Sequence, residues 1–303
     1  MFALETKLAE LEETNQDYLT QTLSKILSKL TGRFDRFIDE QIRAIEDTKV
    51  KIKKRKGVIA FMKTFPFFSS TVENMLPTPR ANRFEVRHMV NEIYSRINKA
   101  MFESLKFIAK ESPVVQKQQA VTAGDTEDKE ILNYHILLIE NMNHYVEEVE
   151  VRDIPVLEEW KTRAVGEMKE HMDLYLAAVI RRPLGKLLDF LESTESLLDH
   201  SPDGKAIATR ASHSRSTFKK LLSTFDAKEI RRGIETLKKR VEKHFGDADD
   251  PGLSRNLVQK VLRECEEEYG RIYERTGRIV RDVYEGELEV EFKREDVGAA
   301  FRR

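Results

Sequence analysis

Apolar residues along this chain recur at helical spacing, most regularly between Asp226 and Phe245. In that stretch they follow one another at intervals of four, three, four and four residues, which places them on one face of an α-helix: Ile230, Ile234, Leu237, Val241 and Phe245. Asp226 can cap the start of this helix, Glu229 can complete a capping-box pair, and Gly246 can end it. Because each large side chain contributes roughly 1.5–3 kcal/mol only when it is buried, other helices must cover this face.

The same spacing covers most of the chain. It predicts helices over residues 4–11, 19–66, 84–110, 129–148, 156–198, 226–245 and 253–283, with residues 212–225 leading into the sixth of them. The second of these passes through the basic run at 49–56 and is expected to end at Pro66, because proline lacks the backbone N–H. Pro183 is expected to kink or restart the fifth helix, residues 156–198. Only Glu287–Phe292 alternates as a strand does, and a single strand has no obvious partner.

Interruptions of the pattern suggest how the chain is divided. Periodicity is lost over residues 112–128, which read as a linker or loop, and turn residues gather at Leu76–Pro79, Arg152–Pro155, His200–Gly204 and Gly246–Gly252. We therefore expect an all-α protein made of two helical bundles, residues 1–124 and residues 125–303.

Composition supports this fold class and narrows the function. The chain has 303 residues, of which 35% are charged and only 13 are glycine, and its net charge is −1. That balance disfavours nucleic-acid binding, which usually goes with a basic surface. Three features predict a soluble intracellular chain. The sequence has a lone cysteine, its start lacks the layout of a secretory signal, and its longest apolar run is the seven residues Leu174–Ile180.

The strongest candidate for a contact site is the basic run Lys49, Lys51, Lys53, Lys54, Arg55 and Lys56. Near an anionic membrane each positive charge could contribute about 1 kcal/mol, and the adjacent phenylalanines at 61, 65, 67 and 68 could insert. The alternative, which we favour, is a solvated helix face beside a buried apolar seam, with the phenylalanines packed in the core or between bundles.

Catalytic and metal-binding patterns find no support. Residues 247–252 resemble a calcium loop only superficially, because Pro251 takes a ligand position and Val258 stands where the bidentate glutamate belongs. His135 and His144 lack the spacing of zinc ligands, and His135 is expected to be a satisfied, partly buried group. Cys265 is flanked by glutamates, which raise a thiol pKa. We therefore expect no enzyme activity, no cofactor and no metal.

Several long blocks resemble the C-terminal region of the exocyst complex component 1 family. These blocks are RFIDEQIRAIEDTKVKIKKRKGVIAFMKTFP at 36–66, VENML at 72–76, NYHILLIENMNHYVEEVEV at 133–151, DAKEIRRGIETLKKRVEKHF at 226–245 and EYGRIYERTGRIVRDVYEGELEVEF at 268–292. The resemblance runs over nearly the whole chain. Members of this family are much longer, and their N-terminal lipid- and GTPase-binding module has no counterpart in these residues.

The resemblance implies an elongated rod of stacked helical bundles, the architecture called CATCHR. It implies a subunit of the exocyst, which tethers secretory vesicles to the plasma membrane before SNARE-driven fusion. The expected partners are other exocyst subunits, with small GTPases, SNARE-related proteins and the anionic plasma membrane as further candidates, and no nucleic acid. The expected location is cytoplasmic, peripheral at plasma-membrane sites of exocytosis. The alternative is a peripheral phosphoinositide-binding module that uses the basic run at 49–56.

Overall fold

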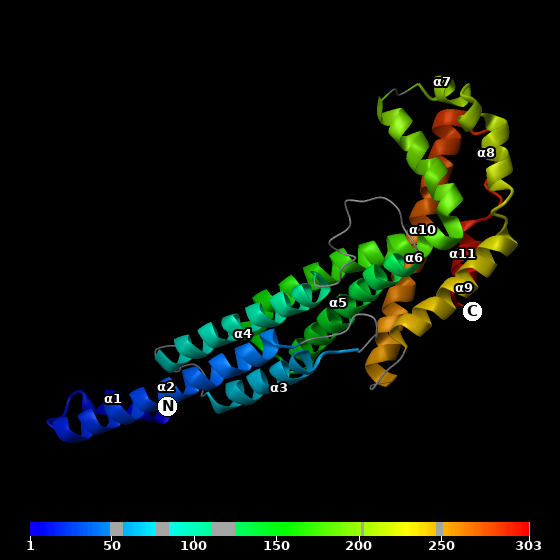
Figure 1. Cartoon of the computed structure of the whole chain (residues 1–303). Helices are drawn as coiled ribbons and strands as arrows, with labels where there is room; N and C mark the ends of the chain where they lie inside the picture. The colour runs from blue at the N-terminus through cyan, green and yellow to red at the C-terminus, as the bar shows by residue number, and fades with distance from the viewer. Residues whose placement is uncertain (49–56, 77–84, 111–124, 201–202, 247–250, 303) are drawn as a thin grey trace. The chain divides into compact units, whose positions relative to one another are not determined.

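The computed structural model describes residues 1–48, 57–76, 85–110, 125–200, 203–246 and 251–302 (Figure 1). Throughout these residues the regular structure is helical, without a strand, so the all-α prediction is confirmed. The described residues form two compact units, Met1–Lys169 and Glu170–Arg303. The predicted division at residue 124 stays a prediction, because most of the stretch 112–128 that motivated it lies outside the described residues. Residues 125–128, which the sequence pattern assigned to a loop or linker, belong to α5 (Asp125–Val151) instead.

The first unit contains five helices and the beginning of a sixth. They are α1 (Phe2–Leu11), α2 (Asp17–Glu46), α3 (Ala60–Met75), α4 (Glu85–Lys110), α5 (Asp125–Val151) and the first part of α6 (Glu158–His200), which the short 3-10 turn Pro155–Leu157 precedes. α2 packs along both α1 and α4, and α3 packs along α4 and α5 (Figure 1). The polar gap expected after Leu11 is therefore the turn between α1 and α2.

Aromatic side chains join α4, α5 and α6 in the core of this unit. The ring of Phe102 on α4 lies 5.5 Å from the ring of Tyr145 on α5 and 5.4 Å from that of Trp160 on α6, in edge-on geometry. The Tyr145 hydroxyl donates a hydrogen bond of 2.7 Å to the buried side-chain oxygen of Asn98. These contacts tie three helices together through one buried cluster.

The prediction of one helix from residue 19 to Pro66 is wrong. α2 ends at Glu46, and α3 begins at Ala60 and continues through Pro66 to Met75. A buried amide oxygen of Asn141 on α5 accepts from the N–H of Ile59, at 2.8 Å, and so marks the start of α3. Pro66 is itself buried in the packed face of α3, and this burial offsets the hydrogen bond that proline removes.

The second unit contains the rest of α6, then α7 (Gly204–Ala208), the 3-10 turn Ala211–His213, α8 (Arg215–Leu222), α9 (Ala227–Phe245), α10 (Pro251–Tyr284) and α11 (Arg294–Arg302). α6 continues through Pro183 as one helix rather than restarting there. α10 packs against α7, α9 and α11 (Figure 1). At the contact with α7, a Cβ atom on Gly204 would lie 2.1 Å from the carbonyl oxygen of Asp282, so only glycine allows this approach.

The helix that the sequence defines most clearly forms as expected. The Asp226 carboxylate accepts from the Glu229 N–H at 2.8 Å, and the helix ends at Gly246. All five apolar residues of its predicted face are buried. The segment Glu287–Phe292, which alternates as a strand would, is not a strand; its Phe292 is buried instead, with its ring 5.6 Å from that of Tyr273 on α10.

Candidate functional site

The basic run that the sequence singles out, Lys49 to Lys56, lies outside the described residues, so its contact with lipid or with a partner stays a prediction. The neighbouring phenylalanines on α3 divide between two environments. Phe65 is buried, with its ring 6.0 Å from that of Tyr94, as core packing predicts. Phe67 is 60% exposed and lies under the guanidinium of Arg152, 5.4 Å from the ring centroid. The phenylalanines therefore do not form one exposed wedge.

Titratable side chains that could support chemistry are placed as structural groups. Cys265 is fully buried, and burial, with a smaller contribution from Glu264, raises the pKa of its thiol to about 12. The sequence argument named the glutamates alone, whereas burial is the larger cause. His135 is buried, beside the ring of Tyr134. In the described part of the chain, no three histidine, cysteine or acidic side chains cluster to hold a metal ion.

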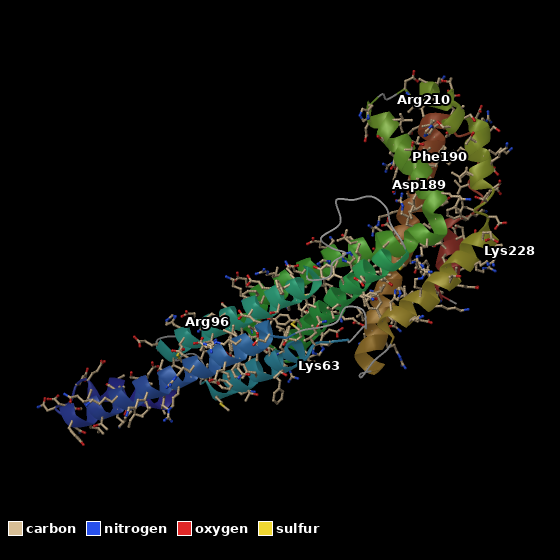
Figure 2. The ribbon with its side chains drawn as sticks, in the orientation of Figure 1. Lys63, Arg96, Asp189, Phe190, Arg210 and Lys228 are labelled. Atoms are coloured by element: carbon tan, nitrogen blue, oxygen red, sulfur yellow. The ribbon has the colours of Figure 1, made fainter. Side chains whose placement is uncertain are left out.

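Charged side chains coat the outer faces of the helices (Figure 2). Arg96, labelled on α4, pairs with Asp39 on α2 across the contact between these helices. Lys228, labelled near the start of α9, is exposed. In the second unit Arg275 on α10 makes two hydrogen bonds, of 2.9 and 2.6 Å, with the Glu195 carboxylate on α6. None of the described helices is long and apolar enough to cross a membrane.

Two surface features stand out against this charged background. The first is an apolar stripe along α2, which we call the α2 stripe. Its members are spaced by seven, four and seven residues, so they lie on one line along the helix, and between 38% and 46% of each is exposed: Leu19, Ile26, Leu30 and Phe37. Near its end the rings of Phe34 and Phe37 stack at 6.5 Å. An exposed apolar stripe rimmed by polar residues is typical of a protein contact surface.

The second feature is a pocket of about 370 Å³ in the second unit, which we call the arginine pocket. It lies among α6, α9, α10 and the connection between α8 and α9. The lining consists of Val179, Arg182, Pro183, Leu184, Thr224, Phe225, Glu229, Ile230, Arg232, Gly233, Thr236, Leu237, Arg240 and Tyr269. Its volume is near the lower end of the range of about 300–1,000 Å³ found for ligand pockets.

The local sequence explains how this pocket forms. Gly233 on α9 faces Pro183 on α6, and a Cβ atom on this glycine would lie 3.3 Å from the Cβ of the proline. The small residue therefore allows close approach of the two helices beside the pocket. Behind it lies the hydroxyl of Tyr269 on α10, 3.9 Å from the same Cβ position. Residues of three helices, separated by about forty to fifty positions in sequence, thus contribute to one cavity.

Sequence reasoning missed this pocket altogether. Arg182 and Arg240 belong to ordinary charged faces in the sequence, and nothing there tells which faces of α6 and α9 meet. Gly233 is the only weak signal, since a glycine inside a strongly periodic helix often marks a close approach.

Taken together, the fold and these surfaces define an all-α helical-bundle protein. The family described as "Exocyst complex component Sec3, C-terminal" matches residues 1–286, and the chain belongs to this family. This finding agrees with the resemblance seen in the sequence.

Three curated relatives carry the same description, "Exocyst complex component 1". The relative from Mus musculus is 22% identical over 281 residues, covering 92% of this chain and 28% of the relative. The relative from Drosophila melanogaster is 23% identical over 290 residues, covering 95% of this chain and 29% of the relative. The relative from Dictyostelium discoideum is 20% identical over 272 residues, covering 89% of this chain and 28% of the relative. The chain therefore spans less than a third of the length of these relatives. No solved structure matches the chain.

Proposed function

We propose that this chain is the C-terminal helical part of an exocyst subunit and acts as a non-catalytic scaffold in the tethering of secretory vesicles to the plasma membrane. The observation that carries the proposal is the family match over residues 1–286. The proposed partners are other exocyst subunits, and the proposed location is the cytoplasmic side of the plasma membrane at sites of exocytosis. Small GTPases and SNARE-related proteins are further candidate partners.

The described surfaces suit a scaffold. Long helices present extended faces, and several modest contacts on one chain combine by raising the effective concentration of each further contact. The α2 stripe is the apolar surface on the first unit that best fits such a role, because its four members lie on one line and are only partly covered. A partner helix laid along α2 would complete the cover of this stripe.

Retention of the remaining exocyst subunits on the immobilised 303-residue chain tests the proposal. We expect retention by the unmodified chain, and a decrease in affinity of about tenfold or more when Ile26 and Leu30 are both replaced by serine, since central apolar residues dominate binding energy. The matched control is Phe107→Ser, which alters an exposed apolar residue of α4 in the same unit.

If the unmodified chain retains none of the subunits, the scaffold proposal is refuted. If the chain retains them but Ile26→Ser/Leu30→Ser binds as tightly as the unmodified chain, the scaffold stands and the α2 stripe is not the contact. Equal losses of affinity in the control and in the double variant would indicate a non-specific effect of exposed serine rather than a contact at α2.

A further inference from the structure

Positive charge is in excess in the lining of the arginine pocket. Its lining has three arginines and one glutamate, a surplus of two positive charges. Glu229 lies 3.8 Å from Arg232, so that arginine has an acidic neighbour. Among the residues that the structure describes, neither Arg182 nor Arg240 forms an ion pair. The positive charges of Arg182 and Arg240 repel each other.

The surroundings of Arg240 disfavour its positive charge in the absence of a bound anion. Partial burial, followed by repulsion from Arg182, lowers the pKa of its guanidinium. Both effects disfavour the charge in this place, and an anion beside the two side chains would offset the repulsion between them. Arginine is suited to this role because its planar fork of N–H donors matches a carboxylate bidentately.

A third donor also lines the pocket. Tyr269 is almost completely buried, and in the described part of the chain its hydroxyl has no hydrogen-bond partner. Burial raises the pKa of this hydroxyl, so it remains a donor at neutral pH. Native folds rarely leave a buried polar group unpaired, and a ligand or an ordered water usually meets it.

The walls between these donors are apolar. Val179, Leu184, Ile230 and Leu237 are buried residues of the lining, from α6 and α9. The pocket thus offers donors for one anionic group and aliphatic surface for the stem that carries the charge.

We propose that the arginine pocket binds an acidic side chain, with its aliphatic neighbours, from a peptide segment of a protein partner. A glutamate brings one negative charge and a methylene stem. Free phosphate is a poorer fit, because it brings no apolar stem for the walls and its second charge is opposed by Glu229. The proposal rests on the scaffold function only in that the ligand belongs to a protein.

The test uses two peptides and the 303-residue chain with labelled isoleucine, leucine and valine methyl groups. The acidic peptide is acetyl-Leu-Glu-Glu-Leu-amide, and the neutral peptide carries glutamine in place of both glutamates. We expect the acidic peptide to shift the methyl NMR signals of Val179, Leu184, Ile230 and Leu237 and to bind at least tenfold more tightly than the neutral one. Inorganic phosphate, titrated in parallel, is expected to bind more weakly than the acidic peptide.

Substitutions then identify the donors. Arg182→Gln and Arg240→Gln are each expected to weaken binding of the acidic peptide about tenfold or more, and Tyr269→Phe by a smaller factor. The matched control is Arg231→Gln. Arg231 is exposed and lies on α9, as Arg240 does, but it does not line the pocket. Each arginine substitution removes one member of a repelling pair, so the thermal midpoint should stay constant or rise. A purely structural arginine would instead lower the midpoint when replaced.

The proposal is overturned if the two peptides bind equally, if the shifts fall outside the pocket, or if phosphate binds more tightly than the acidic peptide. Equal binding by Arg240→Gln and Arg231→Gln would also overturn it. Because the peptide titration contains no other subunit, its failure leaves the scaffold proposal intact. In the same way, failure of the subunit retention assay leaves the peptide result intact.

Discussion

The buried hydrogen bond between Tyr145 and Asn98 makes the packing of the first unit open to a sharp test. The Tyr145 hydroxyl donates to the Asn98 side-chain oxygen at 2.7 Å, and both residues are completely buried. Replacing Tyr145 by phenylalanine keeps the ring against Phe102 but removes the donor. The amide oxygen of Asn98 then has to stay buried without this hydrogen bond.

The expected cost follows from that unpaired oxygen. A buried acceptor that loses its partner costs about 1–3 kcal/mol, whereas removing both partners in favour of apolar groups of similar shape can be nearly neutral. We therefore expect Tyr145→Phe to lower the free energy of unfolding by about 1–3 kcal/mol. Adding Asn98→Leu should recover part of that loss, so the double variant should be less destabilised than the sum of the two single variants.

Urea unfolding followed by the fluorescence of Trp160 is the appropriate assay. This side chain is the only tryptophan of the chain, and its ring lies 5.4 Å from that of Phe102, beside the altered bond. A free energy of unfolding for Tyr145→Phe within about 0.5 kcal/mol of the unmodified chain would refute the argument, since that is the range of neutral substitutions. Strict additivity of the two substitutions would refute it as well.

Three further predictions concern the second unit and one glycine of the first. Asp226→Ala removes the cap of α9 and should destabilise by about 0.5–2 kcal/mol in urea unfolding followed by circular dichroism; Asp226→Asn, which can still cap, should not. Gly204→Ala should lower the thermal midpoint, because its Cβ would clash with the carbonyl of Asp282, whereas Gly166→Ala in open helix should raise it; equal shifts would contradict this reasoning. Burial raises the pKa of Tyr284 to about 12, so its stabilising contribution is complete below the unfolded value near 10 and is lost as pH rises toward 12. Tyr284→Phe should therefore reduce the loss of stability over that interval by up to about 1.4 kcal/mol per pH unit in urea titrations, and an unchanged slope would contradict this assignment.

The sequence was most informative where one helix face alone is apolar. The cap of α9 at Asp226 and its buried face could be predicted because local spacing determines both. The break at Arg152–Pro155 was predicted from its turn residues, and the structure places Asp153 there with a positive φ of 47°. These features depend on neighbours in sequence, and tertiary packing did not override them.

The failures arise where distant packing decides. Pro66 lies inside α3 because burial against other helices outweighs one missing hydrogen bond. α11 was missed because its buried residues are few and small, with Val297, Gly298 and Ala300 providing its covered face. The arginine pocket depends on which faces of α6, α9 and α10 meet, and periodicity carries no information about that pairing.

The burial of Cys265 has a practical consequence for spectroscopy. It is the only cysteine of the chain, and its thiol is both inaccessible and held in the protonated form by a pKa raised to about 12. Maleimide reagents attack the exposed thiolate, so the native chain should remain unmodified. A cysteine introduced at an exposed position could then carry a fluorophore or spin label selectively, and pairs of such positions would give distances between helices without removal of the native residue.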